Sequence, residues 1–275
     1  MIKALVVFFL LIGSSVSWAQ SITSETEGGE KKKWRAIVDV QHVPALREDQ
    51  EAYTDVVAIG DYFLNKKHRV RVLQSGSKLY QKFDSEYEFQ TADTQLYHYY
   101  AFEDKPLGLG YIWRNQFSLP VSDISGRDDL VTRLTSMMFI NKVLNGGSLF
   151  LSLRPFGRYN WYKYRTSAGG RRLPLYTFGA TALASYSVND KVAITGVAYY
   201  SIEGTNSSQF DPDFVQKENG IYSFTVSSSY QLTKEISAYA SYSSGAANYI
   251  NQGRYEVYLY DQDNSRYGLG LTAMF

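Results

Sequence analysis

From Trp34 onward, apolar and polar residues alternate along the chain in a series of segments roughly ten residues long. A period of two places successive side chains on opposite faces of a β-strand. In segment 221–232, one set of alternate residues contains Tyr, Phe, Val and Leu, and the other contains mainly Ser and Thr. Segment 175–188 repeats the pattern, with Tyr, Phe and Ala opposite Thr, Gly and Ser. The chain is therefore predicted to be all-β, with one apolar face on each strand.

The alternation predicts about twelve strands. They are 34–43, 53–64, 69–79, a segment ending at Phe102, 107–119, 130–144, 149–162, 175–188, 192–203, 221–232, 236–243 and a last strand ending at Phe275. The alternation slips near Asp93, which indicates a bulge. Turns of a few residues, such as 65–67 and 145–147, alternate with longer polar loops. This arrangement is typical of an up-and-down antiparallel topology.

The two faces indicate where the strands lie. Aromatic residues occur near the strand ends and small apolar residues near their middles, as in the aromatic girdles of membrane barrels. A β-sandwich would also alternate, but its inner face should carry bulky apolar residues. Ser and Thr cannot fill a dry core without leaving polar groups unsatisfied. The sequence therefore predicts a closed antiparallel transmembrane β-barrel with a wet interior.

The last ten residues, 266–275, show one apolar face most clearly. Its members are Tyr267, Leu269, Leu271, Ala273 and Phe275. This stretch resembles the C-terminal strand of bacterial outer-membrane proteins, in which a terminal Phe with alternate apolar residues is read by the barrel assembly machinery. The resemblance implies an outer-membrane location, with outer-membrane lipid, lipopolysaccharide and that machinery as partners.

The N-terminus has the pattern of an export signal. Lys3 precedes the apolar run 4–12, and small residues lead to Ala19. We expect a signal peptide at 1–19, a disordered periplasmic lead-in at 20–33 and a single barrel domain at 34–275. An even strand count would then leave both ends of the barrel in the periplasm.

The amino-acid composition excludes several classes of function and site. The chain has 28 Lys and Arg against 27 Asp and Glu, so it has no large basic field for nucleic acid. It has no Cys, which excludes disulfides and thiolate metal sites, and no cofactor or metal motif is evident. The 24 Tyr suit strands and membrane interfaces.

If the apolar faces meet lipid, the opposite faces line the interior. The predicted pore-lining residues are Arg114, Arg133, Arg154, Arg158, Asp39, Asp61 and Glu203. Further inward residues by the same alternation are Arg69, Arg71, Glu86 and Glu88. One hypothesis is a cationic wall facing an acidic wall across a water-filled pore. The alternatives are a charged network that plugs a narrow barrel and, for some arginines, binding of lipopolysaccharide phosphates.

The rival class is a membrane-embedded hydrolase. Outer-membrane phospholipases and lipid A deacylases resemble this chain in general plan, but they place His and Ser two residues apart on one strand. Residues two positions after His42, His68 and His98 are Pro44, Val70 and Tyr100. We therefore expect no catalytic residues.

The sequence most resembles monomeric channels of about twelve strands, in size and layout. The predicted function is passive passage of small polar or anionic solutes. The alternatives are a closed structural or adhesive barrel that acts through its external loops and, less favoured, an unrecognised enzyme.

Overall fold

A computed structural model describes residues 33–45, 52–80, 88–164, 166, 173–205, 219–249 and 265–275. The expected signal peptide and nearly all of the expected lead-in lie outside these residues. Within the described residues, no helix has the length and hydropathy needed to cross a membrane.

The described chain is dominated by antiparallel strands. These are β1 (Trp34–Val43), β2 (Tyr53–Phe63), β3 (His68–Leu79), β4 (Phe89–Thr91), β5 (Thr94–Ala101), β6 (Gly110–Leu119), β7 (Leu130–Leu144), β8 (Leu149–Tyr162), β9 (Pro174–Ser187), β10 (Val192–Thr205), β11 (Asn219–Gln231), β12 (Ile236–Tyr249) and β13 (Arg266–Met274). Short helical turns are η2 (Pro106–Gly108), α3 (Asp123–Arg127) and η3 (Asn145–Gly147).

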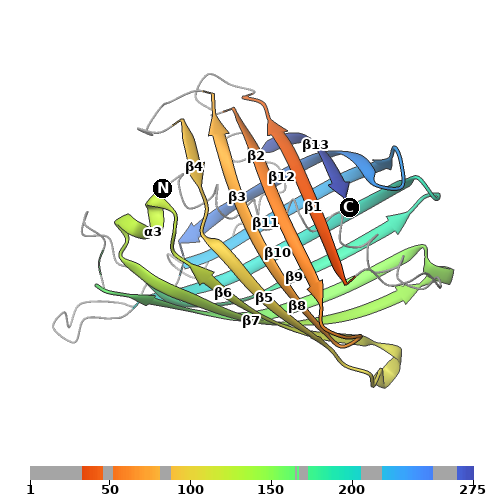
Figure 1. Cartoon of the computed structure of the whole chain (residues 1–275), viewed down its shortest axis with the longest axis horizontal. Helices are drawn as coiled ribbons and strands as arrows, with labels where there is room; N and C mark the ends of the chain where they lie inside the picture. The colour runs from red at the N-terminus through yellow and green to blue at the C-terminus, as the bar shows by residue number, and fades with distance from the viewer. Residues whose placement is uncertain are drawn as a thin grey trace.

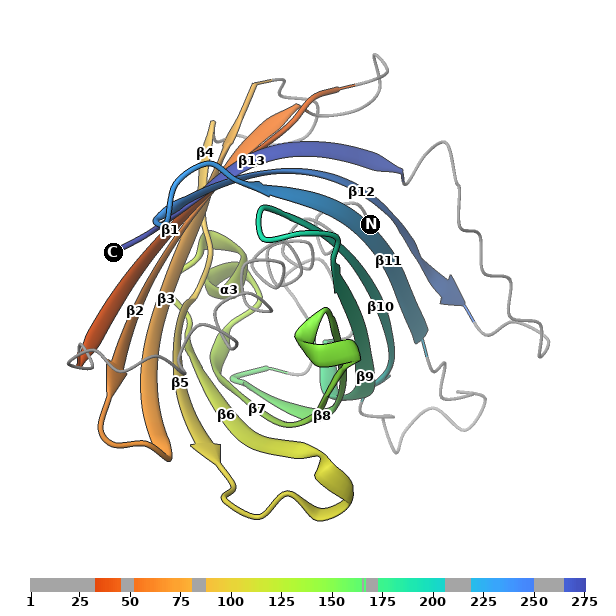
Figure 2. The same ribbon diagram turned by 90° about the vertical axis from the view of Figure 1, so that its right-hand side faces the viewer.

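The strands close into a ring. Each main strand pairs with the main strands before and after it in the chain, including β2 with β3. The first strand, β1, pairs with the last, β13. The short β4 pairs only with the end of β3, so the barrel has 12 strands and one extra strand. Figure 1 shows the tilted strands from the side, and Figure 2 shows them arranged around a ring. The predicted fold class is confirmed.

The two ends of the barrel differ. At one end, which we call the short-turn end, brief connections join β2 to β3, β5 to β6, β7 to β8, β9 to β10 and β11 to β12. At the other, the long-loop end, the connections are longer. The strand series begins and finishes at the short-turn end, where the N–H of Phe275 donates to the carbonyl of Ala36 at 2.8 Å.

The outer face is apolar and exposed. On β13, Leu269 is 63% exposed and Leu271 is 52% exposed, and Phe178 on β9 is 61% exposed. Monomeric soluble proteins rarely expose contiguous apolar surface of this kind. The outward set matches the apolar faces that the alternation predicts.

The inner face has two different halves. On β9 to β13 it carries many small hydroxyl residues, such as Thr177, Thr195, Ser227 and Thr272, all of which are buried, and a smaller apolar cluster in which Leu183 and Val197 pack with Phe150 of β8. On β1 to β7 it carries a buried apolar cluster, comprising Ile37, Val57, Ile59, Leu73, Tyr97, Tyr99 and Phe139. The expectation of a small polar inner face is therefore wrong for β1 to β7.

Most strand boundaries lie within two residues of the predicted ones, but β12 continues to Tyr249, six residues beyond the predicted end at Ser243. The slip near Asp93 is a one-residue offset, because β3 pairs Gly76 with Thr91 and Leu73 with Gln95. The segment from Leu107 begins with η2, where Leu107 has a φ of 58°, and β6 starts only at Gly110. The polar loop before β7 contains α3, whose Ser122 cap accepts a hydrogen bond from the Ser125 N–H.

Gly270 allows a close contact inside the barrel. It pairs with Tyr239 on β12, whose ring occupies the space where a side chain at Gly270 would lie. From this position the Tyr239 hydroxyl donates to Asp39 Oδ2 at 2.9 Å. Because Gly270 has no side chain, Tyr239 of β12 can reach across β13 and bond to Asp39 of β1.

We predict that Gly270→Ala displaces the Tyr239 ring and breaks its bond to Asp39. The change should lower the free energy of unfolding by about 1–3 kcal/mol, the usual cost of overpacking. Urea titration of the barrel folded into lipid vesicles measures the effect. Gly196→Ala is the matched control, because a Cβ at Gly196 meets no heavy atom within 4 Å. Equal stability of the two variants would contradict the role of Gly270.

Candidate functional site

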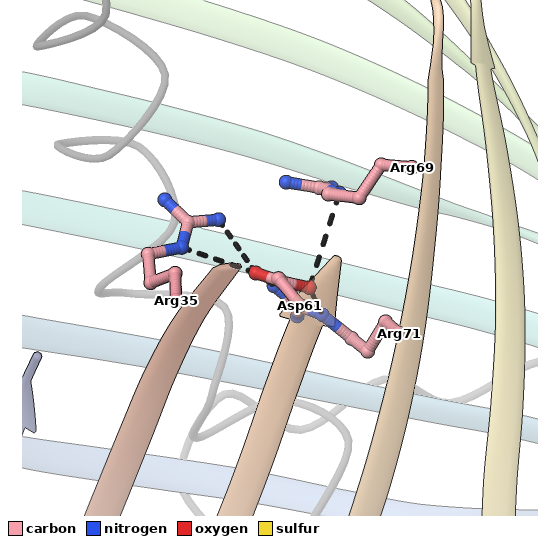
Figure 3. Close-up of polar contacts among 4 residues, drawn as sticks. All are labelled: Arg35, Asp61, Arg69 and Arg71. Carbon is pink, nitrogen blue, oxygen red and sulfur yellow. Dashed lines mark hydrogen bonds and ion pairs between the residues drawn. The ribbon is translucent and has the colours of Figure 1, made fainter. Parts of the chain in front are cut away.

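Three arginines surround one buried carboxylate inside the barrel, near the short-turn end. Arg71 donates to both oxygens of Asp61, from Nε at 2.6 Å and from Nη2 at 2.7 Å. Arg35 on β1 donates from Nη2 to Asp61 Oδ2 at 2.7 Å, and Arg69 Nε lies 4.0 Å from Asp61 Oδ1. Figure 3 shows these side chains meeting from β1, β2 and β3.

The cluster follows from strand register. Asp61 pairs directly with Arg35 on one side and with Arg71 on the other, so all three side chains point to the same face. The Asp61 side chain is fully buried, and a buried carboxylate requires such partners. Asp61 therefore belongs to a cationic cluster and does not contribute to an acidic wall.

Arginines and aromatic rings continue around the inner wall. Arg69 lies 4.2 Å from the Tyr99 ring centroid, and Arg114 lies 5.1 Å from that of Tyr97. The Phe139 ring on β7 contacts Arg114 from β6 at 5.4 Å and Arg154 from β8 at 4.8 Å. We call this set the arginine–aromatic band: Arg69, Arg71, Tyr97, Tyr99, Arg114, Phe139, Arg154, Phe156 and Arg158.

Three guanidinium groups of the band lack acidic partners. Within the described chain, no carboxylate lies within 4.0 Å of Arg114, Arg154 or Arg158. The buried Nε atoms of Arg114 and Arg158 have no hydrogen-bond partner, and Arg154 Nε donates to Ser152 Oγ at 3.0 Å. Aromatic faces attract these cations, but they do not neutralise them. This part of the wall therefore carries excess positive charge.

Two acidic residues occupy the inner face elsewhere. Asp39 on β1 accepts hydrogen bonds from Thr272 Oγ1 at 2.5 Å and from the Tyr239 hydroxyl. Asp55 on β2 accepts one from Ser77 Oγ at 2.5 Å. Both carboxylates are buried, and their side-chain partners in the described chain are neutral hydroxyls.

The acidic residue Asp39 and the arginines of β8 lie on opposite walls. The ring runs β1–β13–β12–β11–β10–β9–β8 in one direction and β1–β2–β3–β5–β6–β7–β8 in the other, so β8 is six steps from β1 either way. Arg154 and Arg158 therefore lie across the barrel from Asp39. Charges of opposite sign on facing walls produce a field transverse to the barrel axis.

The remaining predicted residues lie at other places on the wall. Arg133 donates to Asn160 Oδ1 at 2.8 Å on the inner face between β7 and β8. Glu203 is on β10, two strands from β8, and so lies on the cationic side of the ring. Glu88 is exposed and pairs with Lys78 at 3.4 Å near the long-loop end. Glu86 lies outside the described residues.

Solved structures share this architecture. The COG4313 outer membrane channel from Pseudomonas putida F1 is similar with a TM-score of 0.60 at 12% identity, over 92% of this chain and 98% of that chain. The NanC porin is similar with a TM-score of 0.54 at 10% identity, over 86% and 98% of the two chains. This chain has the fold of bacterial outer-membrane β-barrels. No family model matches the chain, and no curated protein matches it by sequence.

Hydrolytic chemistry finds no support in the described part of the barrel. His42 Nδ1 contacts Thr54 Oγ1 at 3.0 Å, and His68 Nδ1 contacts His98 Nε2 at 3.0 Å. No described serine hydroxyl is hydrogen-bonded to a histidine, as an activated nucleophile would be. No group of three or more His, Asp or Glu side chains among the described residues is arranged to hold a metal.

Sequence reasoning missed several residues of this site. Arg35 and Asp55 share the alternation of Asp39 and Asp61, respectively, so the same rule could have identified them as inward. The inward position of Tyr97 and Tyr99 had no such signal. Aromatic residues occupy both faces of β5, and alternation cannot separate the faces there.

We predict that Asp61→Asn destabilises the barrel by about 3–5 kcal/mol, because it leaves buried guanidinium groups without their carboxylate. Denaturant unfolding in vesicles gives the free energy of unfolding. Asp55→Asn is the matched control on the same strand and face, since its side-chain partner is the neutral Ser77. A smaller loss for Asp61→Asn than for Asp55→Asn would contradict the importance of the cluster.

Proposed function

We propose that this protein is an outer-membrane channel through which small polar or anionic solutes diffuse passively. The observation that carries the proposal is the set Arg114, Arg154 and Arg158, which lies on the inner wall without carboxylate partners in the described part of the chain. Such a wall attracts anions, and an opposing carboxylate at Asp39 orients solutes that also carry a positive group. The fold shared with solved outer-membrane channels supports the same proposal.

The structural setting suggests how the barrel lies in the membrane. The exposed apolar outer face would meet lipid, with lipopolysaccharide around the long-loop end. The short-turn end would face the periplasm, together with both ends of the strand series. The outward row on β13, from Tyr267 to Phe275, would serve as the signal for the barrel assembly machinery.

A closed barrel is the second candidate, and the buried apolar cluster favours it. Ile37, Ile59, Leu73 and Phe139 pack together inside the barrel, where an open aqueous channel has no need for them. A closed barrel would act structurally or adhesively through its external loops. Conductance separates the two candidates, because a closed barrel gives no current steps above leak in planar bilayers.

For the channel, we predict that Arg154→Ala combined with Arg158→Ala lowers the preference for anions. Removing two cations from the wall weakens the attraction for anions, so the reversal potential in a salt gradient should shift toward zero. Asp39→Asn should shift it in the opposite direction. Lys191→Ala, which removes one cation from the exposed turn between β9 and β10, is the control away from the inner wall and should leave it unchanged. Reversal potentials that are identical in all four proteins would remove the arginine wall from the proposal.

For the orientation, we predict that a cysteine placed at Lys163 reacts with an impermeant maleimide on intact cells, whereas one placed at Lys66 does not. Both side chains are exposed, Lys163 at the long-loop end and Lys66 at the short-turn end. The natural chain has no Cys, so labelling reports only the introduced thiol. The reverse labelling pattern would mean that the barrel has the opposite orientation in the membrane.

A further inference from the structure

The lipid-facing surface carries a row of three polar side chains at mid-height on β5, β6 and β7. His98 on β5 pairs with Asn115 on β6, and Asn115 pairs with Ser136 on β7, so the three side chains lie side by side on the outer face. We call these residues the outer polar row. All three are half-buried in the isolated barrel.

Apolar residues flank the row along each strand. On β6, outward Trp113 and Phe117 lie on either side of Asn115, and they are 45% and 41% exposed. On β7, outward Met138 and Leu134 flank Ser136 in the same way. The row therefore lies within the apolar band, away from the aqueous ends of the barrel.

Local contacts satisfy part of the row. His98 Nε2 contacts His68 Nδ1 at 3.0 Å, and Ser136 Oγ accepts a hydrogen bond from Trp113 Nε1 at 2.7 Å. The side-chain amide of Asn115 has no hydrogen-bond partner within the described chain. Acyl chains offer no hydrogen-bond partner, and leaving a polar group unpaired in hydrocarbon has a large free-energy cost.

Other parts of the barrel provide the contrast. Outward residues at the middle of β9, β10 and β12 include Ala180, Ala182, Ala198 and Ala240, which suit contact with acyl chains. On β11 the outward, exposed Ser228 is a single hydroxyl between outward residues Ile194 and Ala240. The outer polar row differs from these strands because it places three polar side chains next to one another on β5, β6 and β7.

We propose that the outer face of β5 to β7 binds a second copy of this chain within the membrane, with Asn115 of each copy paired across the interface. A twofold axis along the membrane normal keeps every residue at the same depth in both copies, so Asn115 meets its own counterpart. A primary amide is self-complementary, because each carbonyl accepts a hydrogen bond that the other NH₂ donates. The exposed Trp113, Phe117 and Leu134 supply apolar contacts around the amide pair.

Cysteine cross-linking in proteoliposomes of the purified protein tests this interface. The chain has no Cys, so Phe117→Cys introduces a single thiol beside Asn115 on the outer face and keeps the amide. We expect a short bis-maleimide to produce a covalent dimer. The matched control is Ala240→Cys on β12, directly opposite β6 in the ring, which should stay monomeric. Equal cross-linking of both variants, or none for Phe117→Cys, would overturn the proposal.

A second measurement uses variants that retain a lipid-compatible surface. Single-molecule photobleaching in bilayers of varied protein density gives the dimer fraction. Asn115→Leu should weaken dimerisation by roughly three- to twenty-fold, the range for interhelical hydrogen bonds in membranes. Asn115→Gln, which keeps the amide, should weaken it less. If the wild-type protein is monomeric at every density, a second copy is ruled out as the occupant. A dimer fraction that Asn115→Leu leaves unchanged also rules it out.

Conductance is independent of this test. The row lies on the outer face, so Asn115→Leu should leave the current per barrel unchanged. Loss of dimers with intact current steps supports the interface, whereas absence of current in every variant bears only on the channel.

Discussion

The hydrogen bonding of β1 to β13 is the constraint on which the structure depends. Register from Ile37–Met274 to His42–Leu269 closes the sheet, so every main strand has a neighbour on both sides. In a bilayer this closure is obligatory, because lipid cannot satisfy the backbone groups of an open edge. Closure also fixes the faces. Once the ring exists, each residue of a strand points either to the interior or to the surroundings, and a one-residue slip would exchange the two sets.

That constraint explains how arginines come to line the interior. A guanidinium on the outer face would meet hydrocarbon, whereas on the inner face it can use neighbours presented by adjacent strands. Direct cross-strand pairing gives Arg71 the carboxylate of Asp61. Arg114 on β6 and Arg154 on β8 instead lie against the ring of Phe139 on β7, the strand between them. The first arrangement neutralises one guanidinium charge with Asp61 and joins β1, β2 and β3. The second holds the cations in place but keeps their charge, which is what a selective wall requires.

The fold was predictable because period-two alternation records which side of a strand meets lipid. The strands 34–43, 130–144 and 149–162 have the predicted boundaries, and even the break at Asp93 was signalled by the slipped pattern. Asp93 lies between β4 and β5, and its carboxylate accepts hydrogen bonds from the hydroxyls of Ser122 and Ser125. Alternation predicts which face of a strand a residue occupies, but not which residues it contacts on the neighbouring strands. It could place Asp61 inside but not reveal the arginines around it, because cross-strand register depends on turn geometry. It also failed on β5, where tyrosines occupy both faces.

The inner and outer surfaces of the barrel are asymmetric in the same half of the ring. On the inner face, β6 and β8 carry the arginines that lack carboxylate partners in the described chain, and on the outer face β5 to β7 carry the outer polar row. In the other half, small hydroxyls such as Thr195 lie inside beside Leu183 and Val197, and the outside is mainly apolar, as at Ala198 on β10. A barrel wall only one residue thick cannot separate these surfaces, because consecutive residues such as Arg114 and Asn115 belong to opposite faces of one strand. An interface on the outside of β6 would therefore lie directly behind Arg114, yet it would use side chains that do not reach the interior.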